Sequence, residues 1–112
     1  MFTKKNRFHG YGSLKGVYSR GISVRGTMIS LKFSLRDPGR PYRVAVVVSK
    51  KVSKSAVKRN RIRRRVYENV RLSEVPILPG TDLVFTIFSD QVAELESAKL
   101  QKQIDELLKK AQ

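Results

Sequence analysis

Basic side chains gather in residues 50–71, and their types and spacing favour binding of phosphate groups. This stretch holds ten Lys or Arg residues and one acid, Glu68. Within residues 59–65, arginine outnumbers lysine five to none. The planar guanidinium of arginine can bind two phosphate oxygens at once, whereas lysine acts as a point charge. The pattern therefore predicts a surface for a structured phosphate backbone. A solvated helical face is the alternative, but such faces usually interleave both signs of charge.

Asn60 stands among these arginines, and two hypotheses are kept for it. Its side chain could contact a base edge, a sugar or a phosphate. Alternatively, it could serve near the helix start, hydrogen-bonded to nearby backbone.

Few residues could support catalysis by the polypeptide itself. His9 is the single histidine, and the absence of cysteine excludes disulfides and thiolate metal sites. Asp82 and Asp90 flank a predicted strand and could touch a Mg²⁺ ion shared with RNA phosphates, with turn or helix-cap roles as the alternative. No glycine-rich phosphate loop or nucleophile motif is present. We therefore expect no chemistry from this chain alone.

The charge of the whole chain indicates a polyanionic partner. Its 112 residues carry a net charge of +15, with +18 in residues 1–73 and −3 in residues 74–112. Self-repulsion on this scale opposes compaction, so we interpret the charge as serving a polyanion. No apolar run suits a secretory signal or a membrane span. We expect one cytoplasmic RNA-binding domain, residues 1–112, with residues 1–11 flexible.

Hydrophobic periodicity predicts the elements that position the basic stretch. The fold class is α+β, a two-layer sandwich of a small mixed sheet with helices packed on it, in the order α-β-β-(β)-α-β-α. In chain order we expect a helix at 12–20, a short optional strand at 22–25, a half-buried strand at 26–35, a central strand buried on both faces at 42–50, a helix from about Ala56 capped by Ser53 or Ser55, a second buried strand at 81–88 and a helix at 91–111.

The helix that carries the basic stretch is predicted to be amphipathic. Ile62, Val66 and Val70 fall within one sector of about 80°. One side would therefore face a core and another a partner. The second sector holds Arg61, Arg64, Arg65 and Arg71.

RNA is the favoured partner. The basic helix lacks bulky aromatics on its apolar face, which argues against a membrane surface. No helix-turn-helix pair or zipper flanks the helix, which argues against a DNA-binding regulator. Tyr18 and Tyr42 stand near basic residues and could stack on unpaired bases, with core packing as the alternative.

The run RVAVVVSKKVSKSAVKRNRIRR, residues 43–64, resembles the central signature of the protein subunit of bacterial ribonuclease P. In that family a strand ending in a Val-Ser-Lys-Lys-like turn leads into a helix with Arg-Asn-Arg, any residue, and two basic residues. The resemblance extends over most of the chain. The segment NRF…LKGVYSRG is similar to the family's first helix, TDLVFTIFSD to its last strand, and the ending LLKKA to its C-terminal helix.

This resemblance implies a fold like the second domain of a small-subunit ribosomal protein, with a left-handed β-α-β crossover at residues 42–88. It also implies removal of the 5′ leader from precursor tRNA by hydrolysis of one phosphodiester bond. The active site and its Mg²⁺ would lie in the RNA subunit. The implied partners are that RNA and precursor tRNA, with no membrane and no small-molecule substrate. A structural RNA-binding protein, such as a ribosomal protein, is the alternative.

The resemblance also assigns residues. Leu14, Tyr18 and Lys32 would contact the leader, although the family often has an aromatic residue at the position of Leu14. Tyr67 stands where the family often has a further arginine; either one expected phosphate contact is missing there, or Arg65 or Arg71 replaces it. The residues expected to bind the RNA subunit are Lys50, Lys51, Lys54, Lys58, Arg59, Asn60, Arg61, Arg63, Arg64 and Arg65.

Overall fold

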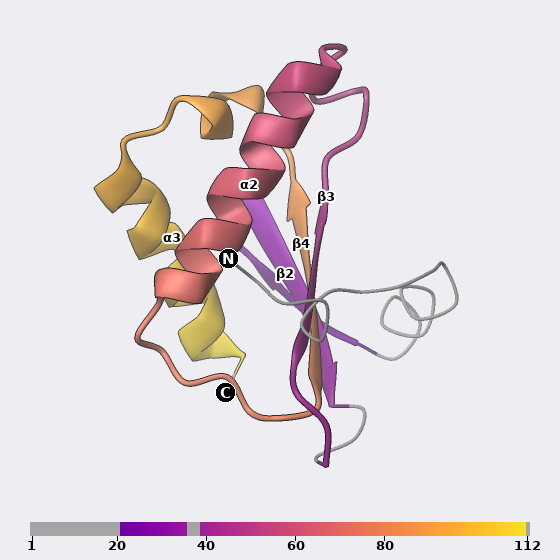
Figure 1. Ribbon diagram of the computed structural model, residues 1–112, viewed down its shortest axis with the longest axis vertical. Coiled ribbons are helices and arrows are strands. Elements are labelled where there is room, and N and C mark those ends of the chain that lie inside the picture. The colour runs from indigo at the N-terminus through magenta and orange to yellow at the C-terminus, as the bar shows by residue number, and fades with distance from the viewer. Residues whose placement is uncertain (1–20, 36–38, 112) are drawn as a thin grey trace.

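The computed structural model describes residues 21–35 and 39–111, in which two helices and a short turn of helix lie against one sheet (Figure 1). The expected α+β sandwich is confirmed. The predicted helix at 12–20 lies outside the described residues, as does the segment 1–11. The elements are β1 (Ile22–Arg25), β2 (Ile29–Leu35), β3 (Arg43–Val47), α2 (Ala56–Leu72), β4 (Thr81–Ile87), the 3-10 helix η2 (Asp90–Ala93) and α3 (Ser97–Lys110).

The sheet is mixed, with the strand order β1-β2-β4-β3. Strand β2 is antiparallel to both β1 and β4, whereas β3 runs parallel to β4. Because α2 connects β3 to β4, these three elements form the expected β-α-β unit. The handedness of this crossover stays a prediction from the family resemblance.

The prediction of a central strand at 42–50 is wrong for the described sheet. There β3 pairs with β4 alone and lies at the edge, while β4 takes the central position. The predicted burial of this strand on both faces is confirmed. Val44 packs into the main core, and Ala45 packs against Val84 on the opposite face. Burial of side chains and pairing of backbone are separate properties, and the sequence pattern reported the first.

The optional strand at 22–25 is confirmed as β1, and its turn shortens the strand predicted at 26–35. The N–H of Gly26 donates to the carbonyl of Ile29 at 2.8 Å, which closes the β1–β2 turn. A Cβ on Gly26 would lie 2.6 Å from that carbonyl oxygen, so any larger residue would open the turn. Strand β2 therefore begins at Ile29.

The main core lies between the sheet and the two helices. Leu31 and Phe85 from the sheet are fully buried against Ile62 and Val66 of α2 and against Ile104 of α3. The alignment of apolar residues predicted for the helix that carries the basic stretch is therefore confirmed. This packing holds α2 to the sheet along one stripe and leaves its other sides exposed or covered by neighbouring segments.

The helix predicted at 91–111 is divided into η2 and α3. In a continuous α-helix, the carbonyls of Val92 and Leu95 would accept from N–H groups four residues ahead. Here both carbonyls instead accept hydrogen bonds from Arg65 of α2. The break therefore coincides with a contact from another element, which local periodicity does not report.

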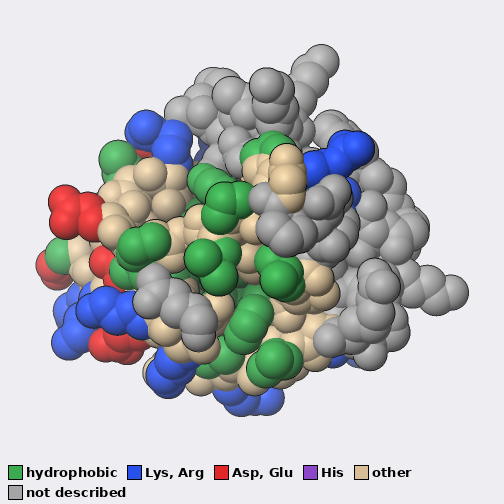
Figure 2. Space-filling model, turned by 90° about the horizontal axis from the view of Figure 1, so that it is seen from below, with side chains coloured by type: hydrophobic (Ala, Val, Ile, Leu, Met, Phe, Trp, Pro, Cys, Tyr) green, Lys and Arg blue, Asp and Glu red, His purple; other side chains and the backbone are tan. Residues whose placement is uncertain are grey.

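Hydrophobic side chains gather at the end of the molecule where loop 73–80 meets the last turn of α3 (Figure 2). Leu72 and Leu78 are more than half exposed there. Pro76, Ile77 and Leu78 line a small depression together with Leu83 of β4 and Leu108 of α3. None of the described helices is long and apolar enough to span a membrane.

Candidate nucleic-acid interface

Helix α2 begins as the sequence predicts. The side chain of Ser55 accepts a hydrogen bond from the N–H of Lys58 at 3.2 Å, which identifies Ser55 as the N-cap. The first turn of α2 contains no acid. The positive end of the helix dipole is therefore not offset within that turn. Exposed Lys50, Lys51 and Lys54 precede this end, so the start of α2 is a concentrated region of positive potential.

One side of α2, formed by Arg59, Asn60 and Arg63 and called here the loop flank, is tied to the loop before the helix. Arg59 donates to the carbonyl of Ser53 at 2.9 Å. Arg63 donates to the side-chain oxygen of Asn60 at 2.8 Å and to the carbonyl of Val48 at 3.4 Å. These bonds orient the two guanidinium groups beside the lysine-bearing loop. The contact of Asn60 is with a side chain, so its role toward RNA stays a prediction.

The outer face of α2 carries Arg61 and Arg64, both exposed. Within residues 21–35 and 39–111, no hydrogen bond or ion pair engages either guanidinium. Val57, one turn before Arg61, is 72% exposed, so this face is not covered by core packing. These two arginines have their full donor capacity available for phosphates.

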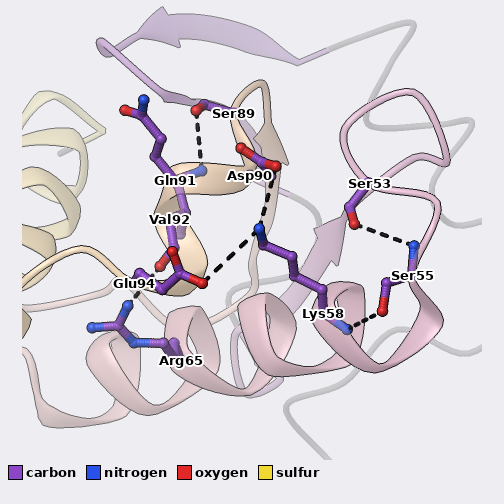
Figure 3. A network of polar contacts seen from close by, with 9 residues as sticks. All are labelled: Ser53, Ser55, Lys58, Arg65, Ser89, Asp90, Gln91, Val92 and Glu94. Carbon is purple, nitrogen blue, oxygen red and sulfur yellow. Dashed lines mark hydrogen bonds and ion pairs between the residues drawn. The ribbon is translucent and has the colours of Figure 1, made fainter.

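The opposite side of α2 carries Lys58 and Arg65, called here the η2 flank, and contacts the segment around η2 (Figure 3). The ammonium of Lys58 lies 3.3 Å from a carboxylate oxygen of Asp90 and 4.0 Å from one of Glu94. Arg65 donates to the carbonyl of Val92 at 2.6 Å and also to that of Leu95. Lys58 and Arg65 thus also have partners within the protein, as Arg59, Asn60 and Arg63 have on the loop flank.

Arg65 and Arg71, the two possible replacements for an arginine at the position of Tyr67, both have partners within the protein, and their role toward RNA stays a prediction. Tyr67 is half-buried and packs against the core. Arg65 lies two residues away, about 200° around the helix, and faces η2. Arg71 forms an ion pair with Glu68, and this hydrogen bond lowers the pKa of the Glu68 carboxyl and raises that of Arg71.

Lys32 lies on the face of the sheet that the described helices leave uncovered. The strand register places it in one row with Ser23, Val84 and Ala45. Its neighbours in β2, Leu31 and Phe33, point to the other face and pack with the core. The predicted leader contact is therefore on the opposite side of the sheet from α2. Leu14 and Tyr18 lie outside the described residues.

Tyr42, considered as a stacking residue, is half-buried and packs against the core, where burial raises its pKa. Next to it, Arg43 forms an ion pair with Asp82 on the same face of the sheet as Lys32. Two hydrogen bonds of 2.8 Å join the guanidinium to both carboxylate oxygens, and the pKa of Arg43 is raised by this contact.

The acids considered for Mg²⁺ do not form a metal site. Asp82 pairs with Arg43, and Asp90 pairs with Lys58. Across the part of the chain that the structure describes, no three His, Cys, Asp or Glu residues group as metal ligands. The expected cap near Asp90 is provided by Ser89, whose hydroxyl accepts from the N–H of Gln91 at 3.2 Å. Both acids are thus engaged by basic side chains, and a Mg²⁺ ion shared with RNA phosphates stays a prediction.

Sequence reasoning treated the basic side chains of α2 as one set and missed their division among three sides of the helix. Angular position carried part of this information. At 100° per residue, Lys58 and Arg65 lie within about 20° of one another and about 100° or more from Arg59 and Arg63. The acids that pair with Lys58 belong to a distant segment, so only the tertiary structure identifies them.

Known proteins identify the family to which this arrangement belongs. The family model described as Ribonuclease P matches residues 2–112. A ribonuclease P protein component of Pseudanabaena sp. is 39% identical over 88 residues, which cover 78% of this chain and 75% of the relative. One of Thermoanaerobacter sp. is 34% identical over 96 residues, which cover 86% and 80%.

Solved structures show the same fold. The RNase P protein of Staphylococcus aureus matches with a TM-score of 0.80 at 24% identity, over 97% of both chains. The RNase P protein of Thermotoga maritima matches with a TM-score of 0.74 at 24% identity, over 87% of this chain and 89% of the other. With the family match over nearly its whole length, this chain belongs to the ribonuclease P protein family.

Proposed function

We propose that this chain is the protein component of a ribonuclease P ribonucleoprotein and binds the catalytic RNA subunit. The observation that carries the proposal is the oriented cationic surface at the start of α2. There Arg59 and Arg63 are tied to the loop that bears Lys50, Lys51 and Lys54, beside exposed Arg61 and Arg64. Fixed guanidinium groups bind a structured RNA in one register, which a flexible basic tail cannot do.

The substrate side of the proposal concerns the opposite face of the sheet. Lys32 and the expected contacts Leu14 and Tyr18 would bind the 5′ leader of precursor tRNA. The protein would then hold the catalytic RNA on one side and the leader on the other. This arrangement supports endonucleolytic removal of the leader and formation of the mature tRNA 5′ end.

The chemical step belongs to the RNA subunit in this proposal. Mg²⁺, held mainly by the RNA subunit and the substrate, would activate water and stabilise charge during phosphodiester hydrolysis. The chain's own contribution is electrostatic and positional. Its arginines neutralise phosphates that otherwise repel one another, and binding releases counterions from the RNA.

A reconstitution assay tests this function. The protein is mixed with a bacterial ribonuclease P RNA and precursor tRNA at low Mg²⁺, where the RNA alone is nearly inactive. Leader removal that depends on the protein is the expected result. If stimulation fails, the RNA subunit from the same organism is used. Failure with that partner, while RNA binding persists, would indicate a structural RNA-binding protein instead.

A further inference from the structure

The η2 flank carries an inference that rests on the proposed function and assigns a different role to two of the basic residues. Arg65 uses both terminal nitrogens of its guanidinium to donate to the carbonyls of Val92 and Leu95. A bidentate phosphate contact through the same two nitrogens would remove these bonds. Val92 is fully buried, so its carbonyl could not replace the lost hydrogen bond with one from water.

Lys58 is committed in a similar way. It precedes Arg65 by seven residues, about two turns, and so lies on the same side of α2. Asp90 and Glu94 both oppose its charge, at 3.3 and 4.0 Å. A lysine already paired with protein carboxylates releases few counterions when phosphate arrives, because its charge is partly compensated beforehand.

The two flanks hold α2 from opposite sides of its buried stripe. Arg59 and Arg63 bond to loop 48–54, while Lys58 and Arg65 bond to residues 90–95. The stripe of Ile62 and Val66 fixes the distance of the helix from the sheet. A rotation of α2 about its axis would break the bonds of one flank or the other. The η2 flank therefore restrains the direction in which the loop flank points.

We propose that Lys58 and Arg65 are positioning residues of the RNA interface and not phosphate ligands. Through α2 they set the orientation of Arg59 and Arg63, and the acid-bearing segment 90–95 is the fixed support against which they act. The acidic last third of the chain thereby contributes to RNA recognition without touching RNA.

Replacement of Asp90 distinguishes the two possible roles of Lys58, phosphate binding and positioning, because they predict opposite changes in RNA affinity. If Lys58 bound phosphate, Asp90→Asn would free its charge, and affinity for the RNA subunit would rise. If Lys58 positions α2, the same change loosens the helix, and affinity falls, by an expected three- to tenfold. The control is Glu106→Gln, which removes an equal charge from an exposed site on α3. A rise in affinity with Asp90→Asn beyond that of the control would overturn the proposal.

Replacement of Arg65 is tested through the salt dependence of RNA binding. For Arg65→Met we expect weaker binding but an unchanged slope of log K against log salt. A true phosphate ligand would lower the slope by about one unit. The loss of RNA affinity caused by Arg65→Met should also be smaller in a protein that already carries Arg59→Met, because Arg65 acts through Arg59. A lowered slope, or an affinity equal to that of the unaltered protein, would contradict positioning. Arg65→Lys, which keeps one donor nitrogen in place of two, should restore part of the affinity.

A measurement on the protein alone separates this inference from the proposed function. Residual dipolar couplings of backbone amides report the orientation of α2 relative to the sheet. We expect Asp90→Asn and Arg65→Met to change these couplings in α2 while those of β2 and β4 stay constant. Unchanged couplings would overturn the positioning role. If the couplings change but the unaltered protein does not bind ribonuclease P RNA, the proposed function fails and the inference about α2 stands.

Discussion

The nine basic side chains predicted to bind RNA, with Asn60 among them in the sequence, differ in what surrounds each of them. Arg61 and Arg64 are exposed on the outer face of α2, and no hydrogen bond or ion pair within the described residues engages them. Lys58 and Arg65, on the same helix, are bonded to residues 90–95. A cation without an internal partner gains the most from a phosphate, because no existing contact is lost.

For Arg61→Ala and Arg64→Ala we therefore expect a loss of RNA affinity that is largest at low salt. Each change should lower the slope of log K against log salt by about one unit. Stability should change by no more than about 0.5 kcal/mol, because both sites are on the surface. Lys99→Ala on α3 is the matched control, since it removes the same charge from another exposed helix. An unchanged slope for both arginine variants would exclude them as phosphate contacts.

The Glu68–Arg71 pair gives a prediction for the titration of the Glu68 carboxyl. The hydrogen bond from Arg71 lowers the pKa of Glu68 from its ordinary value of 4.5. A carboxyl with a lowered pKa in the folded state adds stability above its unfolded pKa, and this contribution is lost as pH falls through the folded pKa. Carboxyl NMR titration should show Glu68 ionising below 4.5, and Arg71→Ala should raise the value. A titration unaffected by Arg71→Ala would contradict the pairing. Because the Glu68–Arg71 pair lies on the surface, little change in global stability is expected.

At the scale of elements, the N-terminus of α2 is the feature on which the interface depends. Ser55 caps it through a hydrogen bond to the N–H of Lys58. Loss of a serine cap costs about 1 kcal/mol. We expect Ser55→Ala to reduce the free energy of unfolding by about this amount, measured by urea denaturation. Glu96→Ala at the start of α3 is the control, because its side chain makes no capping hydrogen bond. Equal losses in both variants would argue against the cap.

The sequence predicted those elements whose signals are local. The start of α2, its buried stripe of Ile62, Val66 and Val70, and strand β4 could all be read from spacing and capping chemistry. The edge position of β3 could not, because strand order depends on pairing between distant segments. The division of α2 into flanks depends on the same kind of information. The ion pair of Lys58 with Asp90 and the hydrogen bond of Arg65 to Leu95 form only after β4 has placed the η2 segment beside the helix.

At the scale of the whole molecule, the uneven charge of the chain is offset in part by its fold. The first 73 residues carry most of the basic residues, and the remaining segment is net acidic. Acids of this segment pair with bases of the first, as Asp82 does with Arg43 and Asp90 with Lys58. Much positive charge still lies exposed around α2, so the folded protein should gain stability from anions.

Added polyanion should therefore raise the midpoint of thermal unfolding. We expect inorganic polyphosphate to bind the folded cationic surface more tightly than it binds the unfolded chain, so that the folded state is stabilised by mass action. Sodium chloride at equal ionic strength controls for screening of repulsion. A midpoint that rises no more with polyphosphate than with sodium chloride would indicate that the folded surface has no particular affinity for phosphate chains.

The strand order has a consequence for how the protein is made. Strands β2 and β3 each pair with β4, and not with one another. During translation β2, β3 and the arginine-rich helix all leave the ribosome before β4 is available to join them. Chain synthesis proceeds at roughly 5–20 residues per second, so this interval lasts on the order of seconds. During this interval, the highly cationic nascent segment is close to ribosomal RNA while the sheet still lacks its strand β4. The β2–β4–β3 pairing, and with it the oriented surface for RNA, can form only after β4 has been synthesised.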